Sequence, residues 1–270
     1  MSDLSSVASL SVYLIEPSSV QKKIIAGALT AIGVHKIEMF EDAQSALAGM
    51  RVKRPDLVFS ALYLPDMSGV DLIHVMREDD DLENVAFILV SSETRPQVLD
   101  PVRQSGACGI LPKPFTEQQL KTALLTTLDY LMHDESLADE DVNLEELRVL
   151  IVDDSKSSRN YVRRVLENLG VKNFVEAENG RQAVEIMAET FVDLVITDFN
   201  MPEMDGRALI EHIHSKSWQQ SVPILMVTSE QNKSRLAGIE DSGVAGICDK
   251  PFVPNVIKQL LVKILAGNHR

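Results

Sequence analysis

The strongest constraint on the fold is an internal repeat at a fixed offset of 137 residues. At this offset, residues 55–73 (PDLVFSALYLPDMSGVDLI) align with residues 192–210 (VDLVITDFNMPEMDGRALI). The same offset aligns residues 113–115 with residues 250–252, both of which read Lys-Pro-Phe, and the alignment needs no insertion. Self-similarity at a fixed period is typical of a structural unit that occurs more than once. The repeat therefore predicts two copies of one fold.

The repeat divides the chain into two domains and a linker. We expect a first domain over residues 1–131, a linker over residues 132–146 and a second domain over residues 147–270. The linker stretch carries seven acidic residues and no Lys or Arg, which is typical of a solvated segment. An acidic docking segment for a basic partner is the alternative. Two domains of this length are of ordinary size.

Short apolar runs alternate with helical patterns in the second copy. Residues 147–154 and 193–198 are Val- and Ile-rich runs, typical of buried parallel strands. Residues 155–170 have an apolar face at helical spacing (Val162, Val165, Leu166 and Leu169), a capping Ser155 and a terminal Gly170. Further strands are expected at 223–229 and 246–250, and further helices at 207–215, 234–243 and 254–267. This alternation predicts an α/β fold in which helices cover both faces of a doubly wound parallel sheet.

Polar side chains follow or end the predicted strands of the second copy. They are Asp153, Asp154, Asp198, Thr228 and Lys250. Because the carboxyl ends of parallel strands meet at one edge of the sheet, we expect these side chains to converge. Three carboxylates in one pocket repel one another and favour a bound cation, and oxygen ligands in a partly hydrated site suit Mg²⁺. Such a site can transfer a phosphoryl group to a carboxylate nucleophile.

Residues 147–267 resemble a receiver domain of two-component response regulators. The resemblance rests on the acid pair at 153–154, on Asp198 44 residues after Asp154, on Thr228 30 residues later, and on Lys250 22 residues after that. The stretch DDSKSSRNYVRRVLENLG is most similar to the stand-alone receiver of bacterial chemotaxis. The resemblance implies the flavodoxin-like receiver fold, with one five-stranded parallel sheet in each domain.

The resemblance also implies the chemistry of the site. Asp198 would accept a phosphoryl group from a histidine kinase, a phosphotransfer protein or a small phosphodonor. Asp154, Asp198 and the backbone carbonyl of Asn200 would hold Mg²⁺, and Asp153 would act through water. Beyond self-phosphorylation and self-dephosphorylation, we expect no enzymatic activity.

The resemblance implies a switch that reads the phosphate. Thr228 would follow the phosphate, Lys250 would neutralise its oxygens, and the Lys250–Pro251 peptide bond would be cis. The family usually has Tyr or Phe three residues before the lysine, whereas this chain has Ile247. An aliphatic side chain has no ring to expose or hide, so we expect a weaker or differently arranged output.

The first copy keeps the frame of the repeat and lacks its chemistry. The counterparts of the five site residues are Glu16, Pro17, Ala61, Ser91 and Lys113. Because the alanine has no nucleophile and the proline no carboxylate, we expect a pseudo-receiver that is not phosphorylated at this site. We expect the lysine to pair with the glutamate, with a site for another anion as the alternative. The domain would serve as a dimer surface, a localisation handle or a constraint on the second copy.

Charge and hydropathy exclude several classes of function. A net charge of −14 argues against nucleic-acid binding, which needs a basic face. No apolar run reaches the ~18 residues that span a bilayer, and no basic stretch precedes the apolar N-terminal segment, so we expect neither membrane insertion nor a signal peptide. A cytoplasmic location is therefore expected.

These features favour a signalling adaptor over other classes. We expect no output domain after the second copy, so phosphorylation would switch protein–protein contacts with a downstream target, and the resemblance favours motility or chemotaxis control. A phosphate sink or relay element, and the receiver half of a larger regulator, are the alternatives. An aspartyl-phosphate phosphatase is disfavoured, because Asn200 stands where such enzymes need a second acid.

Overall fold

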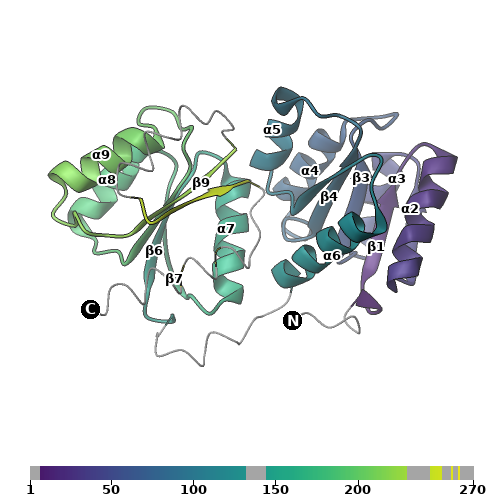
Figure 1. Ribbon diagram of the computed structural model, residues 1–270, viewed down its shortest axis with the longest axis horizontal. Coiled ribbons are helices and arrows are strands. Elements are labelled where there is room, and N and C mark those ends of the chain that lie inside the picture. Colours follow the sequence, from purple (N-terminus) through teal and green to yellow (C-terminus); the bar gives the residue numbers. More distant parts are fainter. Residues whose placement is uncertain (1–6, 132–143, 230–243, 251–256, 258–260, 262–270) are drawn as a thin grey trace. The chain divides into compact units, whose positions relative to one another are not determined.

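The computed structural model describes residues 7–131, 144–229, 244–250, 257 and 261. The chain divides into two compact units, residues 1–132 and 133–270. Each unit consists of a central sheet with helices packed against it (Figure 1).

The first unit is a complete alternation of strands and helices. Its elements are β1 (Ser11–Ile15), α2 (Ser19–Ile32), β2 (Lys36–Phe40), α3 (Ala43–Val52), β3 (Leu57–Ala61), α4 (Gly69–Glu78), β4 (Ala86–Ser91), α5 (Pro96–Gln104), β5 (Gly109–Pro112) and α6 (Glu117–Leu131). The five strands are parallel and lie in the order β2-β1-β3-β4-β5. The strand order reverses direction after β2, so the sheet is doubly wound as predicted.

The second unit repeats this topology. Its elements are β6 (Arg148–Val152), α7 (Lys156–Asn168), β7 (Asn173–Ala177), α8 (Gly180–Glu189), β8 (Leu194–Thr197), α9 (Gly206–Lys216), β9 (Ile224–Thr228) and β10 (Gly246–Asp249). The strands are parallel in the order β10-β9-β8-β6-β7. The prediction of two five-stranded parallel sheets is therefore confirmed.

Some predicted elements are incomplete or lie outside the described residues. The sequence pattern had left residues 171–192 unassigned, and the structure places β7 and α8 there. The predicted helix at 234–243 lies outside the described residues. Of the predicted helix at 254–267, only Ile257 and Leu261 are described, and both are helical and fully buried.

Burial explains why the inner strands are continuous apolar runs. Every residue of β1, β3, β4, β8 and β9 is buried, as expected for strands covered by helices on both faces. The edge strands β2 and β7 are partly exposed instead. Their side chains are therefore more polar, and their sequence signal is weaker.

Helix α7 begins and ends where the sequence predicts. The Ser155 side chain accepts a hydrogen bond from the backbone N–H of Ser158 at the N-terminus. At the other end Gly170 adopts a left-handed conformation with φ of 104°, which costs a glycine little. The predicted apolar face of the helix is buried. Helix α7 therefore begins just after the acid pair that follows β6, and its apolar face is turned to the core.

The end of the predicted linker packs in the second unit. Residues 144–146 form a turn in which Leu144 is buried, and the Glu145 carbonyl accepts a hydrogen bond from Asn173 Nδ2 at 2.8 Å. Residues 132–143 lie outside the described part of the chain. No helix among the described residues has both the length and the apolar character needed to cross a membrane.

Candidate functional site

The carboxyl ends of four strands bring the predicted site residues of the second unit together. Asp153 and Asp154 follow β6, Asp198 follows β8, Thr228 ends β9 and Lys250 follows β10. All of them except Asp154 are at most 4% exposed, whereas Asp154 is exposed at the mouth of the site. Carboxylate oxygens of the three aspartates all lie within 4.8 Å of one another. The predicted convergence of the acids is therefore present in the structure.

Asp198 lies at the centre of this cluster and is 1% exposed. Its nearest donors are the Lys250 ammonium, 3.4 Å from Oδ1, and the backbone amide of Phe199. Among the described residues, neither oxygen of this carboxylate has a hydrogen-bond partner of normal geometry. Burial raises the pKa of Asp198 to about 6; the charge of Lys250 lowers this pKa and the charge of Asp153 raises it. A buried carboxylate with so little compensation is an acceptor for a cation.

Lys250 bridges two of the acids. Its Nζ lies 2.5 Å from Asp153 Oδ2 and 3.4 Å from Asp198 Oδ1, and its backbone N–H donates to the Thr228 carbonyl at 2.8 Å. The ammonium is therefore closer to Asp153 than to the predicted phosphoacceptor. Lys250 thus supplies one positive charge beside the three carboxylates of this site.

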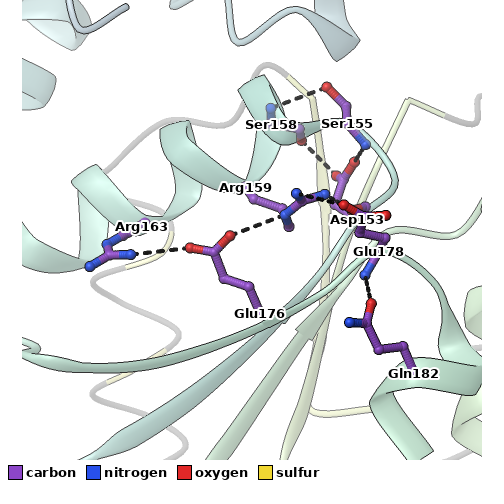
Figure 2. A network of polar contacts seen from close by, with 8 residues as sticks. All are labelled: Asp153, Ser155, Ser158, Arg159, Arg163, Glu176, Glu178 and Gln182. Atoms are coloured by element: carbon purple, nitrogen blue, oxygen red, sulfur yellow. Dashed lines mark hydrogen bonds and ion pairs between the residues drawn. The ribbon is translucent and has the colours of Figure 1, made fainter. Parts of the chain in front are cut away.

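Both carboxylate oxygens of Asp153 accept hydrogen bonds. Its Oδ1 accepts the backbone N–H of Ser155 at 2.9 Å, and its Oδ2 accepts the Ser158 hydroxyl at 2.6 Å in addition to Lys250. Arg159 Nη1 donates to the Asp153 backbone carbonyl at 2.7 Å. Figure 2 shows the contacts that Ser155, Ser158 and Arg159 make with Asp153 at the N-terminal end of α7.

The predicted site residues do not include Ser158 and Arg159, two residues of α7 that contact Asp153. A usable signal was present, because Ser158 lies four residues before Val162 and therefore on the inward face of the same helix. Comparison with the first copy gives a second signal, since Gln21 stands at the position of Ser158.

Asp154 and Asn200 lie at the edge of the pocket. Desolvation and then the charge of Asp153 raise the pKa of Asp154 above its ordinary value, against the charge of Lys250. Asn200 is exposed in the loop after β8. This loop approaches α9 closely: a Cβ on Gly206 would lie 2.2 Å from the Asp198 carbonyl oxygen. Only glycine fits at that position, so the loop is held tightly at the end of β8.

The two predicted switch positions lie on neighbouring strands. Thr228 is fully buried at the end of β9. Ile247 on β10 pairs with Met226 on β9 and is partly buried against the apolar core. The predicted cis bond between Lys250 and Pro251 falls outside the described residues, whereas its counterpart between Lys113 and Pro114 is cis.

At the equivalent position of the first unit, a lysine and a glutamate form an ion pair. Lys113 Nζ lies 2.6 Å from Glu16 Oε2, which confirms the predicted pairing. The other glutamate oxygen, Oε1, accepts the Ser18 backbone N–H at 3.0 Å. Ala61 and Ser91 are buried at the ends of β3 and β4. Pro17 is exposed.

The donor set of the second unit fits a hard divalent cation. It offers carboxylate oxygens at a pocket that is open at Asp154, and it contains a buried carboxylate without full partners. Mg²⁺ prefers such sites, because it retains waters and takes one or two carboxylates. In the first unit the same position carries one carboxylate that already binds a lysine, and it offers no comparable set.

Comparison with known proteins identifies the family. The response regulator receiver domain family matches the chain twice, over residues 12–125 and 149–262. The chemotaxis protein CheY1 of Helicobacter pylori is 37% identical over 123 residues, which cover 45% of this chain and 99% of the relative. A CheY homologue of Campylobacter jejuni is 35% identical over 120 residues, covering 44% of this chain and 92% of the relative.

A solved structure, the chemotaxis response regulator CheY4 of Vibrio cholerae, is 31% identical over 44% of this chain and 98% of that one, with a TM-score of 0.40. The two matches to the family together cover most of the chain, and each falls within one of the two units. The chain therefore belongs to the response regulator receiver domain family of two-component signalling and carries two such domains in tandem.

Proposed function

We propose that the second domain is a phosphorylation switch in which Asp198 accepts the phosphoryl group. The observation that carries the proposal is the state of this side chain: a buried carboxylate whose two oxygens have no full hydrogen-bond partner in the described part of the chain. The pocket also holds two further acids and a buried lysine. Asp154, Asp198 and the Asn200 carbonyl would hold Mg²⁺, with Asp153 acting through water.

Bound Mg²⁺ would supply charge neutralisation for an incoming phosphoryl donor. An Asp198 oxygen forms the new bond to phosphorus as the bond from phosphorus to the leaving oxygen breaks, and the leaving group departs with that electron pair. Lys250 is placed to move from Asp153 Oδ2 towards a phosphoryl oxygen, since it already lies between the two acids. The Thr228 hydroxyl, buried on the neighbouring strand, would donate to another phosphoryl oxygen.

The output would be a change in protein–protein contacts. Phosphorylation biases an equilibrium between two conformations of a receiver, and a partner protein reads the result. The donor would be a histidine kinase or a phosphotransfer protein. Because similar proteins are chemotaxis proteins, we place the downstream target in motility control. The first domain would contribute binding, as a dimer surface or a constraint on the second.

The experiment is incubation of the whole chain with Mg²⁺ and acetyl phosphate, followed by measurement of intact mass. We expect one added phosphoryl group in the wild type, and none in Asp198→Ala. The same experiment with Ala61→Ser, a change at the equivalent position of the first domain, should leave the single addition unchanged. Retention of the added mass in Asp198→Ala would contradict the proposal.

A phosphate sink is the second candidate, and Ile247 favours it. This position usually carries an aromatic ring in the family, and here an aliphatic side chain is half-buried against the core. A domain with a weak output still drains phosphoryl groups from a kinase. Loss of the added mass within seconds, with no partner bound preferentially by the phosphorylated form, would favour the sink over the switch.

A further inference from the structure

The carboxylate of Asp153 accepts three hydrogen bonds, two at one oxygen and one at the other. Oδ2 accepts two donors, the Ser158 hydroxyl at 2.6 Å and the Lys250 ammonium at 2.5 Å. Within the described part of the chain, Oδ1 accepts one hydrogen bond, from the Ser155 backbone N–H at 2.9 Å. An ionised carboxylate has about four lone-pair sites, two on each oxygen. Oδ2 is therefore saturated, and the remaining site belongs to Oδ1.

The backbone of the same residue is fixed by a second group from α7. The Arg159 guanidinium donates through Nη1 to the Asp153 carbonyl, through Nε to Glu176 Oε2 at 3.1 Å and through Nη2 to Glu178 Oε1 at 3.4 Å. Its side chain is 8% exposed, and both acids come from the end of β7 and the residue after it. Figure 2 shows the guanidinium between the ends of β6 and β7. The end of β6 is thereby tied to its neighbour.

The first domain provides an internal comparison. There Ser18 caps the helix and its N–H binds Glu16, Lys113 pairs with Glu16, and Lys22, at the position of Arg159, binds Glu41 at 3.0 Å. These contacts have direct counterparts in the second domain.

Two residues that make contacts at the site of the second domain are replaced in the first. Gln21 replaces Ser158, and Met39, which is 54% exposed, replaces Glu176. The first domain folds into the same sheet order without the hydroxyl and without this acid. The fold therefore does not require them, and they occur in the copy that retains the metal-type acids.

We propose that Ser158 is a positioning residue of the metal site. Its hydroxyl occupies Oδ2 of Asp153 and so directs Oδ1 to the water through which this acid reaches Mg²⁺, while Arg159 holds the backbone in register. The inference rests on the proposed function, since it concerns the same site. Ser158 touches neither the metal ligands of the first coordination sphere nor the phosphoryl group, so it acts on affinity for the ion rather than on transfer.

The test is Mg²⁺ binding to the whole chain by titration calorimetry. Loss of a partner behind a metal-site acid typically weakens metal binding about 10–100-fold, and because Asp153 acts through water we expect about a tenfold loss in Ser158→Ala. Ser157→Ala, one residue earlier on the same helix, is the matched control and should bind like the wild type. Ser158→Thr keeps the hydroxyl and should retain most of the affinity.

A second readout separates positioning from a merely structural role. Acetyl phosphate labelling of Asp198 in Ser158→Ala should need about tenfold more Mg²⁺ for its half-maximal rate, and its rate at saturating Mg²⁺ should stay within about twofold of the wild type. If the alanine variant does not fold, Ser158→Cys has nearly the same shape with only a weak donor and should show the same shift.

The results would separate a failure of this inference from a failure of the proposed function. If the wild type binds Mg²⁺ and Ser158→Ala binds it equally well, the inference is wrong while the proposed function stands. A loss of affinity in Ser157→Ala equal to that in Ser158→Ala would also overturn it. If the wild type neither binds Mg²⁺ nor gains a phosphoryl group, the proposed function fails and the inference fails with it.

Discussion

Replacing Asp198 with Asn should stabilise the metal-free second domain at neutral and alkaline pH. The substitution keeps the shape of the side chain and removes a charge that the pocket compensates poorly. Burial raises the pKa of Asp198 from 3.8 to about 6. Each unit of pKa difference between the folded and unfolded states corresponds to 1.36 kcal/mol, so ionisation of this group costs the folded state about 3 kcal/mol.

The pH dependence follows from the direction of this pKa change. Well below pH ~4 the carboxyl is neutral in both the folded and the unfolded state and costs nothing. As the pH rises towards 6, the unfolded state loses its proton first, and the folded state loses stability relative to it. Above pH ~7 the full cost is present. The advantage of Asp198→Asn should therefore be about 3 kcal/mol at pH 8, and it should shrink towards zero as the pH falls to ~4.

The assay is urea unfolding in the presence of a chelator, at pH 5, 6.5 and 8. Trp218 is the single tryptophan of the chain and lies in the second unit, so its fluorescence reports the unfolding of that unit. Asp249→Asn removes an exposed carboxylate of β10 and serves as the control, with an expected change below about 0.5 kcal/mol. Added Mg²⁺ should stabilise the wild type more than the variant.

The reasoning would be refuted by an Asp198→Asn variant that is no more stable than the wild type at pH 8. A gain of the same size at all three pH values would also refute it, because the gain would then come from packing rather than from the removed charge.

Three further substitutions test other contacts. Gly206→Ala should destabilise the second unit by several kcal/mol, since its Cβ meets a backbone carbonyl; Trp218 fluorescence should show this, and Gly69→Ala in the first unit should leave that signal unchanged. Gln219→Leu should cost about 2–4 kcal/mol in urea unfolding, because its side-chain amide makes three hydrogen bonds with backbone groups at the end of α8 and in the segment that follows it. Lys113→Met should destabilise the first unit by about 2–3 kcal/mol by leaving Glu16 buried without its cation, measured by hydrogen exchange of β1.

The repeat made the topology predictable because it aligned buried strands with buried strands. An inner strand such as β8 is apolar throughout, so its pattern is unambiguous. The edge strand β7 is only partly buried and has the sequence Asn-Phe-Val-Glu-Ala. Its pattern does not indicate a strand, and the sequence predicts neither β7 nor α8. Its place in the sheet is determined by pairing with β6, which is a contact between segments distant in sequence.

The sequence predicts the site residues that follow strands. It does not predict the residues that a helix contributes to the same site. The acids and Lys250 follow strands, so the rule that carboxyl ends meet brings them together. Arg159 is different, because arginine is seldom buried unless it is paired. Its partners Glu176 and Glu178 lie 17 and 19 residues further along the chain. Only the packing of α7 across β6 and β7 makes them neighbours.

The two sites differ in their charge balance, and this difference supports the proposal that only the second binds a cation. Among the described residues, the site of the first unit holds one carboxylate and one ammonium, Glu16 and Lys113, in a close pair. That site is neutral, and its polar groups are satisfied by the protein itself. The site of the second unit sets three carboxylates against Lys250, which leaves an excess of about two negative charges when all three acids are ionised.

This excess is unfavourable in the apo protein and becomes favourable when a divalent ion binds. Under the proposed function, a bound divalent ion would neutralise charge for an incoming phosphoryl group, whose negative charge would compete with Asp153 for the ammonium of Lys250. The first unit has no such excess to relieve, so the substitutions at positions 17 and 61 remove the acceptor and also the reason for a metal to bind. Restoring Asp at position 61 alone should therefore not restore Mg²⁺-dependent phosphorylation, whereas restoring Asp at both positions should recover part of the excess and with it measurable Mg²⁺ binding.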